Sequence, residues 1–502
     1  MRLALSPGWR ACACALLCIA YIAAPLGAAG QDTSCGAPTA PPPLPGTPLP
    51  LPATDAARSA EVDALFAPWA KRQGPGVAVL VTRRGRVLHM KGYGLADVAA
   101  RTPITPHTRF DLASLSKQFT AMAVMQLAAG GQLSYADSLP RYLPAFAEHA
   151  SEVTLRDLLG HTAGVQDYIA LFRGRGPAYT AFPRAARGDS PVPEPSMAEM
   201  LDTLAARPLR FRAGMGWDYS NSGYVLAAAV VEKVARRPFA EYVRERIFQP
   251  AGMASTTFAE YGDEDRPGRA RSYTCTDGGW TRLDYSPLEN VRGAVGVVST
   301  LEDLARWYAA LDASSLVAPG VQAEAFRSGY QTGGQPTEYG FGWVVAAGPG
   351  EERAAHAGWW KGFRNVVLRY PREGLTVVLL SNDARFASYR PELVYRVARL
   401  YRAAAPAARR DVPGAARLAG EYRTVDGDSY GVRAEGGALW VTPPGGARLR
   451  LEALADGEYR VAGLEEDRFR FVPAADRRGP RMIRMQLGFG NTVRTWTVAY
   501  RK

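Results

Sequence analysis

Three short motifs, far apart in the chain, carry side chains that together could perform acyl transfer. They are Ser114-Leu115-Ser116-Lys117, Tyr219-Ser220-Asn221 and His356-Ala357-Gly358. A Ser-x-x-Lys spacing places a hydroxyl and an amine one helical turn apart, on the same face of a helix. A serine hydroxyl is a poor nucleophile until a neighbouring group removes its proton. A partly desolvated lysine, or a tyrosine beside one, can do this at neutral pH.

The first two motifs supply the expected catalytic groups. Ser114 is the candidate nucleophile, although a serine in isolation is more often a helix N-cap. A cation beside Tyr219 lowers the pKa of the phenol, and desolvation lowers the pKa of Lys117, so either group can be the base. Tyr219 is expected to pass the proton to the leaving group and then to activate water, unless it is an amphipathic core tyrosine. Asn221 is expected to orient Lys117 and the substrate amide, or else to be an N-cap.

The third motif is expected on an edge strand beside Ser114. Gly358 would let a substrate backbone approach closely, because it has no side chain. His356 is assigned to substrate binding with the motif, although a lone histidine of this kind is more often structural. Ser116 is expected to pack or to cap.

Composition excludes several classes of protein. The chain has 502 residues, of which 47% are hydrophobic and 22% charged, so it is globular and long enough for two or three domains. The formal net charge of +12 comes mostly from scattered arginines, which favours a solvated basic surface over nucleic-acid binding. The histidines and cysteines lack metal-ligand spacing, so no metal is expected.

Residues 1–30 are typical of a secretory signal peptide. Arg2 and Arg10 precede a short apolar run at 11–24, and small residues follow at 27–30. The run is short for a membrane span, so we expect export to the periplasm or the medium with no stable span after cleavage. An uncleaved anchor is the less favoured alternative. Outside this segment only Cys35 and Cys275 remain, and a disulfide or two free thiols fit equally well.

The rest of the chain divides by composition into four parts. A Pro-rich linker at 31–56 precedes the hydrolase domain at 57–402, and an Ala/Pro/Arg linker at 403–413 precedes a module at 414–502. Apolar residues of that module alternate with a period of two between Gly, Pro and Asp turns. This pattern predicts a small all-β barrel or sandwich, in which no chemistry is evident.

Within 57–402 the order of elements predicts an α+β fold. A hairpin at 76–90 is followed by helices and then by strands near 342–380. Helices are expected at 59–69, 119–127, 153–159, 222–234, 300–311 and 391–401. The expected architecture is an antiparallel sheet flanked by terminal helices, with a helical insertion.

The three motifs resemble those of class C β-lactamases, D-alanyl-D-alanine carboxypeptidases and related esterases. Secondary signatures follow in the same order, at 157–164 (Asp-Leu-Leu-Gly-His-Thr-Ala-Gly), 219–224, 296–305 and 339–343. The resemblance covers roughly residues 59–400, and the ordered set is far more specific than any one motif. It implies a β-lactamase/transpeptidase-like fold, no cofactor, and a small-molecule or peptide acyl substrate. It also implies an oxyanion hole made by the backbone N–H groups of Ser114 and Trp359.

The third motif departs from the family pattern of Lys-Thr-Gly or His-Thr-Gly. Ala357 lacks the hydroxyl that would bind a substrate carboxylate, and a neutral His356 would not replace a cation. Lys361 could compensate, but the sequence does not give its direction. Trp359 and Trp360 are expected to form apolar walls of the cleft, which favours an ester or an uncharged acyl donor over a β-lactam.

The sequence therefore predicts an exported serine hydrolase that cleaves an amide or ester through a Ser114 acyl-enzyme. β-Lactamase, D-Ala-D-Ala carboxypeptidase and esterase activities remain open, as does the oligomeric state. The alternative is a catalytically inactive cell-envelope binding protein that retains the fold. The presence of Ser114, Lys117 and Tyr219 together argues against it.

Overall fold

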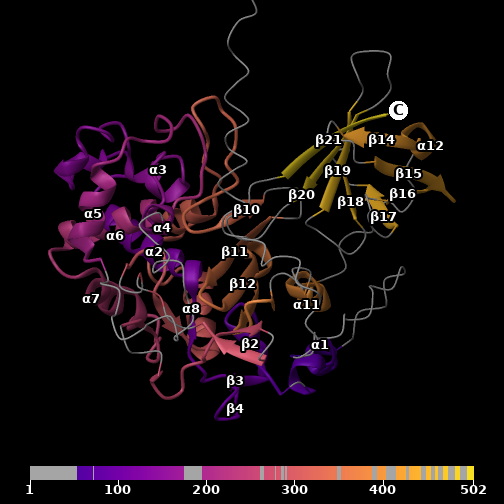
Figure 1. Cartoon of the computed structure of the whole chain (residues 1–502), viewed down its shortest axis with the longest axis horizontal. Coiled ribbons are helices and arrows are strands. Elements are labelled where there is room, and N and C mark those ends of the chain that lie inside the picture. Colours follow the sequence, from indigo (N-terminus) through magenta and orange to yellow (C-terminus); the bar gives the residue numbers. More distant parts are fainter. Residues whose placement is uncertain are drawn as a thin grey trace, which may run out of the picture.

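The computed structural model shows a central sheet, a helical part and a C-terminal barrel (Figure 1). It describes Cys35 and residues 54–71, 73–173, 195–260, 265–276, 279–283, 286, 288, 291–346, 352–386, 393–402, 414–424, 429–442, 448–453, 458–461, 467–472, 481–486 and 495–501. The expected signal segment at 1–30, most of the linker at 31–56 and the linker at 403–413 lie outside the described residues.

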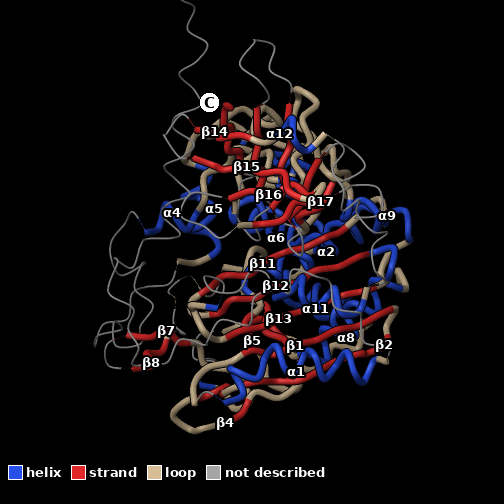
Figure 2. Tube along the Cα trace, turned by 90° about the vertical axis from the view of Figure 1, so that its right-hand side faces the viewer, coloured by secondary structure: helices blue, strands red, loops and turns tan. Residues whose placement is uncertain are grey.

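The central sheet is antiparallel and has the strand order β10-β11-β12-β13-β1-β2. Figure 2 shows these strands following one another from β11 to β2. Their bounds are β1 Val77–Arg83, β2 Arg86–Tyr93, β10 Val344–Ala346, β11 Arg353–Trp360, β12 Phe363–Tyr370 and β13 Leu375–Ser381. In β1, Val77, Val79 and Val81 pack on one face, and Ala78 and Leu80 pack on the other. Both faces are therefore apolar and must be covered.

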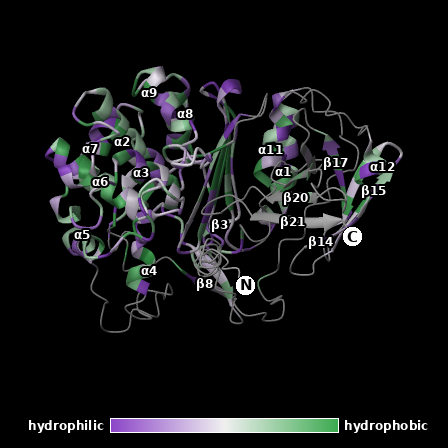
Figure 3. Cartoon of the chain, turned by 90° about the horizontal axis from the view of Figure 1, so that it is seen from above, coloured by the Kyte–Doolittle hydropathy of each residue, from purple (hydrophilic) through white to green (hydrophobic). Residues whose placement is uncertain are grey.

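One face is covered by two helices from the two ends of the hydrolase region. These are α1 (Asp55–Lys71) and α11 (Leu393–Tyr401), whose Phe66, Trp69 and Val397 join the valines of β1 in one core. Figure 3 shows the sheet edge-on, between these two helices and the helical part. The expected antiparallel sheet with flanking terminal helices is confirmed.

The other face carries the helical part, which connects the three motifs. Its elements include α2 Lys117–Ala129, α3 Leu155–Gly160, α4 Tyr168–Arg173, α5 Met197–Ala205, α6 Asn221–Ala235, α7 Phe239–Val243, α8 Leu301–Asp312 and α9 Pro319–Ala323. A small sheet of β5 (Phe110–Asp111), β9 (Val297–Ser299) and β6 (Thr257–Phe258) lies within it. Thr300 caps α8, since its side chain accepts a hydrogen bond from the N–H of Asp303.

The C-terminal region is a closed barrel in which each strand pairs with the next and β21 returns to β14. Its strands are β14 Gly420–Thr424, β15 Ser429–Glu435, β16 Ala438–Thr442, β17 Leu449–Ala453, β18 Glu458–Val461, β19 Asp467–Val472, β20 Arg481–Gln486 and β21 Thr495–Arg501. Side chains such as Tyr422, Val432 and Leu451 form a separate small core. The barrel lies on the side of the sheet that α1 and α11 cover (Figure 3).

A disulfide joins Cys35 to Cys275, whose Cα atoms lie 6.1 Å apart at a sequence separation of 240. It attaches the N-terminal segment to β7 (Tyr273–Thr276), which pairs with β8 (Gly279–Arg282). The sequence had left this pairing open. Among the described residues, no helix combines the length and apolar character that crossing a membrane requires.

Candidate active site

Ser114 lies in a tight turn that links β5 to α2. Residues Ala113–Ser116 form a 3-10 turn, and α2 continues from Lys117. Ala113 has a φ of +50°, a left-handed conformation that is unfavourable for a residue with a Cβ. This turn brings the Lys117 Nζ to 3.1 Å from the Ser114 Oγ, as the Ser-x-x-Lys spacing predicts.

The Lys117 side chain is fully buried and has only neutral groups in direct contact. Its Nζ donates to the Ser114 Oγ, to Asn221 Oδ1 at 2.8 Å and to the carbonyl oxygen of Ala294 at 3.1 Å. It also lies 4.8 Å from the ring centroid of Tyr219. Burial lowers the pKa of Lys117 to about 7, and the charge of Asp167 opposes that fall. At neutral pH a large fraction of this amine is therefore unprotonated.

The Tyr219 hydroxyl is buried, and it makes no hydrogen bond of normal geometry to any described residue. Burial raises the pKa of Tyr219 well above its ordinary value, although the neighbouring Ser114 hydroxyl opposes the rise. The sequence argument had expected a nearby cation to lower this pKa. The direction is the reverse because desolvation of the buried phenolate dominates, and the charge of Asp167 raises the pKa further.

Asn221 is held in one orientation by Asp167. The Asn221 Nδ2 donates to Asp167 Oδ2 at 2.9 Å, and the Asn221 backbone N–H donates to the same oxygen at 2.8 Å. The amide oxygen is thereby directed to Lys117. Ser220, rather than Asn221, caps α6, since its Oγ accepts from the N–H of Gly223.

Sequence reasoning missed Asp167. It lies three residues beyond the secondary signature at 157–164, and no spacing rule links it to Lys117. The available signal was physical: a buried lysine next to an apolar helix needs a carboxylate in its neighbourhood.

His356 is fully buried, and both of its ring nitrogens are occupied. Its Nδ1 lies 2.6 Å from the carbonyl oxygen of Ala357, which can only accept, so Nδ1 carries the proton. Its Nε2 then accepts from the hydroxyl of Tyr339 at 2.8 Å. Burial and the nearby Lys117 lower the pKa of His356 to about 3, so the ring is neutral at pH 7. No ring N–H is left for a substrate.

A second buried histidine, His161, comes from the secondary signature. Its Nδ1 accepts from the backbone N–H of Ser220 at 3.1 Å. Its ring centroid lies 4.3 Å from that of Tyr219 and 4.4 Å from that of Tyr339. Burial holds the pKa of His161 well below its usual range. This neutral ring therefore packs against the ring of Tyr219 and helps to fix its position.

Gly358 allows β11 to pack directly on the Ser114 turn. A Cβ at Gly358 would lie 2.4 Å from the carbonyl oxygen of Leu112 and 3.2 Å from the Cβ of Ala113. The close approach expected of this glycine is thus made by the protein's own backbone. Any larger residue would push the strand away from Ser114.

β11 is not the edge strand of the sheet, because β10 lies outside it. However, β10 pairs with β11 only as far as Ala355. The segment 357–359 of β11 therefore has no β10 residue paired with it. Trp359 on this segment is 41% exposed, whereas Trp360 is buried. Of the two expected apolar walls, only Trp359 is at the surface.

Lys361 forms a buried ion pair with Asp111, the residue at the end of β5 that precedes the Ser114 turn. Its Nζ lies 3.0 Å from Asp111 Oδ2, and both side chains are almost fully buried. The other oxygen, Asp111 Oδ1, accepts from the backbone N–H of Ala113 at 2.9 Å. Asn365 on β12 donates to the carbonyl oxygen of Asp111. These contacts hold the left-handed residue Ala113 in place.

The described part of the chain contains no cluster of three His, Cys, Asp or Glu side chains that could hold a metal ion. What it brings together is a hydroxyl, an amine with a lowered pKa, a phenol and a carboxamide, next to a strand with an open edge. These are the parts needed for acyl transfer.

Comparison with known proteins agrees with this chemistry. The family model Beta-lactamase matches residues 62–402. The chain is 29% identical over 408 residues to "Penicillin-binding protein 4*" of Bacillus subtilis (strain 168), a match that covers 76% of this chain and 86% of the relative. It is 30% identical over 363 residues to "Esterase EstB" of Burkholderia gladioli, covering 66% of this chain and 91% of the relative.

A solved structure shares the fold over most of the chain. It is the octameric penicillin-binding protein homologue from Pyrococcus abyssi, with a TM-score of 0.56 and 21% identity, covering 88% of this chain and 98% of that chain. The resemblance read from the motifs is confirmed by the family match. The chain belongs to the Beta-lactamase family and is a serine hydrolase.

Proposed function

We propose that the protein hydrolyses uncharged esters, and amides more slowly, through an acyl-enzyme on Ser114 with Lys117 as the general base. The observation that carries this proposal is a buried amine 3.1 Å from the Ser114 Oγ with a pKa lowered to about 7. A general base works best when its pKa is close to the working pH. Tyr219 does not meet this condition, because burial raises its pKa.

In the acylation step, neutral Lys117 takes the proton of Ser114 as Oγ attacks the acyl carbon. The bond from the acyl carbon to the leaving oxygen or nitrogen then breaks, and the leaving group receives a proton. Tyr219 supplies that proton, since its hydroxyl stays protonated and has no other partner of normal geometry among the described residues. The proton on Lys117 returns to Tyr219, and the neutral amine then takes a proton from a water whose oxygen attacks the acyl carbon. The bond from the acyl carbon to Ser114 Oγ breaks, and Lys117 returns the proton to Oγ.

The negative charge on the substrate oxygen needs hydrogen-bond donors. We assign this role to two backbone N–H groups. That of Ser114 lies at the start of the helical turn, and that of Trp359 lies on the strand segment that lacks a β10 partner. Losing one such donor typically costs about 10²–10³ in rate. Gly358 supports this arrangement by letting β11 lie against the turn.

The third motif favours an acyl donor without a carboxylate. His356 is neutral and has no free N–H, Ala357 has no hydroxyl, and Lys361 is paired with Asp111. The exposed Trp359 offers an apolar surface next to Ser114. A β-lactam or a terminal D-Ala would place its carboxylate where these residues give it no counter-charge.

Export with removal of a signal peptide at 1–30 is part of the same proposal. Support comes from the Cys35–Cys275 disulfide, since such bonds persist in oxidising compartments. N-terminal sequencing of the protein from the culture medium or periplasm tests it. A mature chain that begins near residue 30 is expected, and a cytoplasmic chain with an intact N-terminus contradicts it.

One set of assays tests the chemistry. The purified protein and Ser114→Ala are incubated with a p-nitrophenyl ester, a chromogenic cephalosporin, benzylpenicillin and a D-Ala-D-Ala peptide, with intact mass recorded for adducts. We expect ester turnover to exceed the other activities and to disappear in Ser114→Ala. Ester turnover that survives the substitution would refute Ser114 as nucleophile. No turnover and no adduct with any substrate would favour the inactive binding protein.

A further inference from the structure

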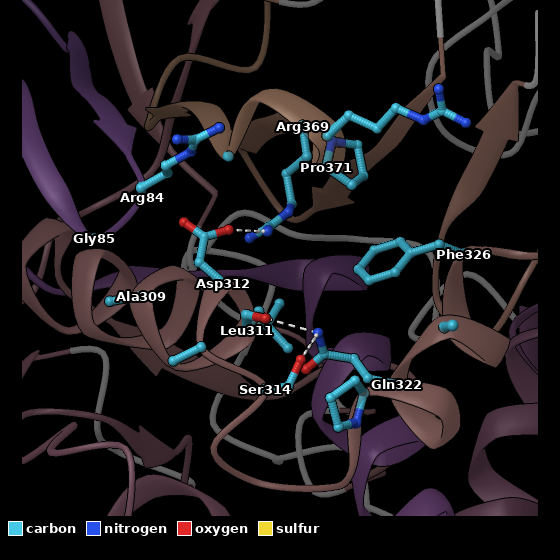
Figure 4. Close-up of a pocket in the computed structure, with 15 residues that line it drawn as sticks. Arg84, Gly85, Ala309, Leu311, Asp312, Ser314, Gln322, Phe326, Arg369 and Pro371 are labelled. Carbon is cyan, nitrogen blue, oxygen red and sulfur yellow. Dashed lines mark hydrogen bonds and ion pairs between the residues drawn. The ribbon is translucent and has the colours of Figure 1, made fainter.

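A cavity lies away from the residues around Ser114, where the β1–β2 turn, the end of α8, α9 and the β12–β13 connection meet. It has a volume of about 500 Å³. Its polar lining includes Arg84, Asp312, Gln322, Arg369 and Arg372, and Phe326 forms part of its apolar wall (Figure 4). Arg369 lies four residues beyond Asn365 on β12, which corresponds to roughly 13 Å along a strand. The cavity is therefore separate from the residues that hold the Ser114 turn.

Arg369 is the central residue of this cavity. It is only 2% exposed, and its Nη2 donates to Asp312 Oδ1 at 2.6 Å. Its Nε and Nη1 are buried and have no hydrogen-bond partner within the part of the chain that the structure describes. The guanidinium lies 5.3 Å from the ring centroid of Tyr308 and 5.9 Å from that of Phe326. Unpaired buried donors are costly, so a ligand that accepts from them gains binding energy.

The charges that line the cavity favour an anion. Three arginines face one carboxylate, Asp312, which leaves an excess of positive charge. Arg372 is paired with Glu352, but Arg84 is exposed at the rim and forms no ion pair with a described residue. Figure 4 shows the guanidinium of Arg369 in contact with Asp312, whereas that of Arg84 does not contact this carboxylate. Planar guanidinium groups bind carboxylates in a bidentate manner.

The same cavity also offers unpaired acceptors. Asp312 Oδ2 and Gln322 Oε1 are buried without partners, while the Gln322 Nε2 is engaged by the carbonyl oxygen of Leu311 at 2.6 Å. A simple anion would leave both oxygens unpaired. A ligand that carries an amino or hydroxyl group next to its carboxylate would satisfy donors and acceptors together.

We propose that this cavity binds a small amino or hydroxy acid, with its carboxylate on Arg369 and Arg84 and its amino or hydroxyl group on Asp312 and Gln322. The site is independent of the chemistry at Ser114. It contacts the far end of β12, the strand that also holds Asp111 through Asn365.

Calorimetric titration of the full-length Ser114→Ala protein tests the proposal, because no ligand is then consumed. The probes are L-lactate, L-alanine, propionate and inorganic phosphate, with the melting temperature followed in parallel. We expect lactate or alanine to bind with a dissociation constant below about 1 mM, and propionate and phosphate to bind at least about fivefold more weakly, since one hydrogen bond contributes about 1 kcal/mol.

Two neighbouring arginines provide a matched pair of variants. Arg84 lines the cavity, whereas Arg86 belongs to the same turn and pairs with Asp55 outside it. Arg84→Ala should weaken binding about tenfold, as expected for one charged hydrogen bond, and Arg86→Ala should leave it unchanged. Equal losses in both variants, no binding of any probe at 10 mM, or phosphate and propionate binding as tightly as lactate would each overturn the proposal.

Discussion

Two buried lysines near the Ser114 turn, Lys117 and Lys361, have different kinds of neighbour. Lys361 contacts the carboxylate of Asp111 directly, at 3.0 Å. Lys117 contacts a hydroxyl, an amide oxygen and a carbonyl oxygen, and Asp167 reaches it only through Asn221. A carboxylate in contact keeps a lysine charged and makes it part of the framework. A carboxylate that acts through an intervening side chain leaves the amine free to exchange a proton.

Replacing Lys117 should produce the largest change in activity. In Lys117→Met, we expect kcat/KM for a p-nitrophenyl ester to fall by about 10²–10⁴-fold, the usual contribution of a general base. Folding stability should be kept or increased, because the substitution removes a buried charge that has no carboxylate in contact. Ester assays and urea unfolding measure the two effects. The exposed Lys233 on α6 is the control, since Lys233→Met should change neither quantity.

Replacing Lys361 should reverse this pattern. Lys361→Met leaves Asp111 with only the more distant guanidinium of Arg269, whose Nη2 lies 3.8 Å from Asp111 Oδ2, so we expect a loss of up to about 3–5 kcal/mol in unfolding free energy. The double variant Lys361→Met/Asp111→Asn should recover more than half of that loss, because asparagine can still accept from the N–H of Ala113. Urea unfolding of the single and double variants decides the matter. Equal stabilities of Lys361→Met and the wild-type protein would show that the ion pair does not hold the turn.

The pH dependence sharpens the comparison further. Only neutral Lys117 can accept a proton, and its pKa is lowered to about 7. We therefore expect kcat/KM to be low below pH 6 and to rise through about pH 7 to a plateau. A profile measured with an ester whose own hydrolysis is subtracted tests this. A rate that starts to rise only above pH 9 would point to Tyr219 instead.

Asp167→Asn should have the smallest effect, and its direction is informative. The carboxylate raises the pKa of Lys117, so its removal should move the rising limb of the pH profile to lower pH. The shift should be accompanied by a modest fall in kcat, since Asn221 loses its anchor. An alkaline shift of the limb would contradict the electrostatic role of Asp167.

The sequence was sufficient for the local parts of this structure. The apolar run of β1, the hydroxyl cap of α8 and the turn between Ser114 and Lys117 depend on residues within a few positions of one another, and the pattern of each is visible in the chain. The family signatures then placed the second and third motifs beside the first. The closed form of the barrel and the disulfide each had two possible outcomes, because strand closure and thiol proximity are properties of the tertiary fold.

The parts that could not be predicted depend on long-range contacts. The partner of Lys361 lies in β5, 250 positions earlier, and only the packing of β11 on the Ser114 turn brings them together. Likewise, the upward shift of the Tyr219 pKa comes from burial of the phenol in the folded chain, which spacing does not specify. Residue types indicated which groups meet, but their orientation decides which of them transfers a proton.

The Cys35–Cys275 bond has a consequence for how this enzyme would survive proteolysis. A peptide bond broken anywhere between residues 36 and 53 would leave the two fragments covalently linked. A lipid, tag or fusion partner attached upstream of Cys35 would thus remain attached to the hydrolase after such a cut. It would be released only when a reductant opens the disulfide, so cleavage would be visible on a reducing gel and invisible on a non-reducing one.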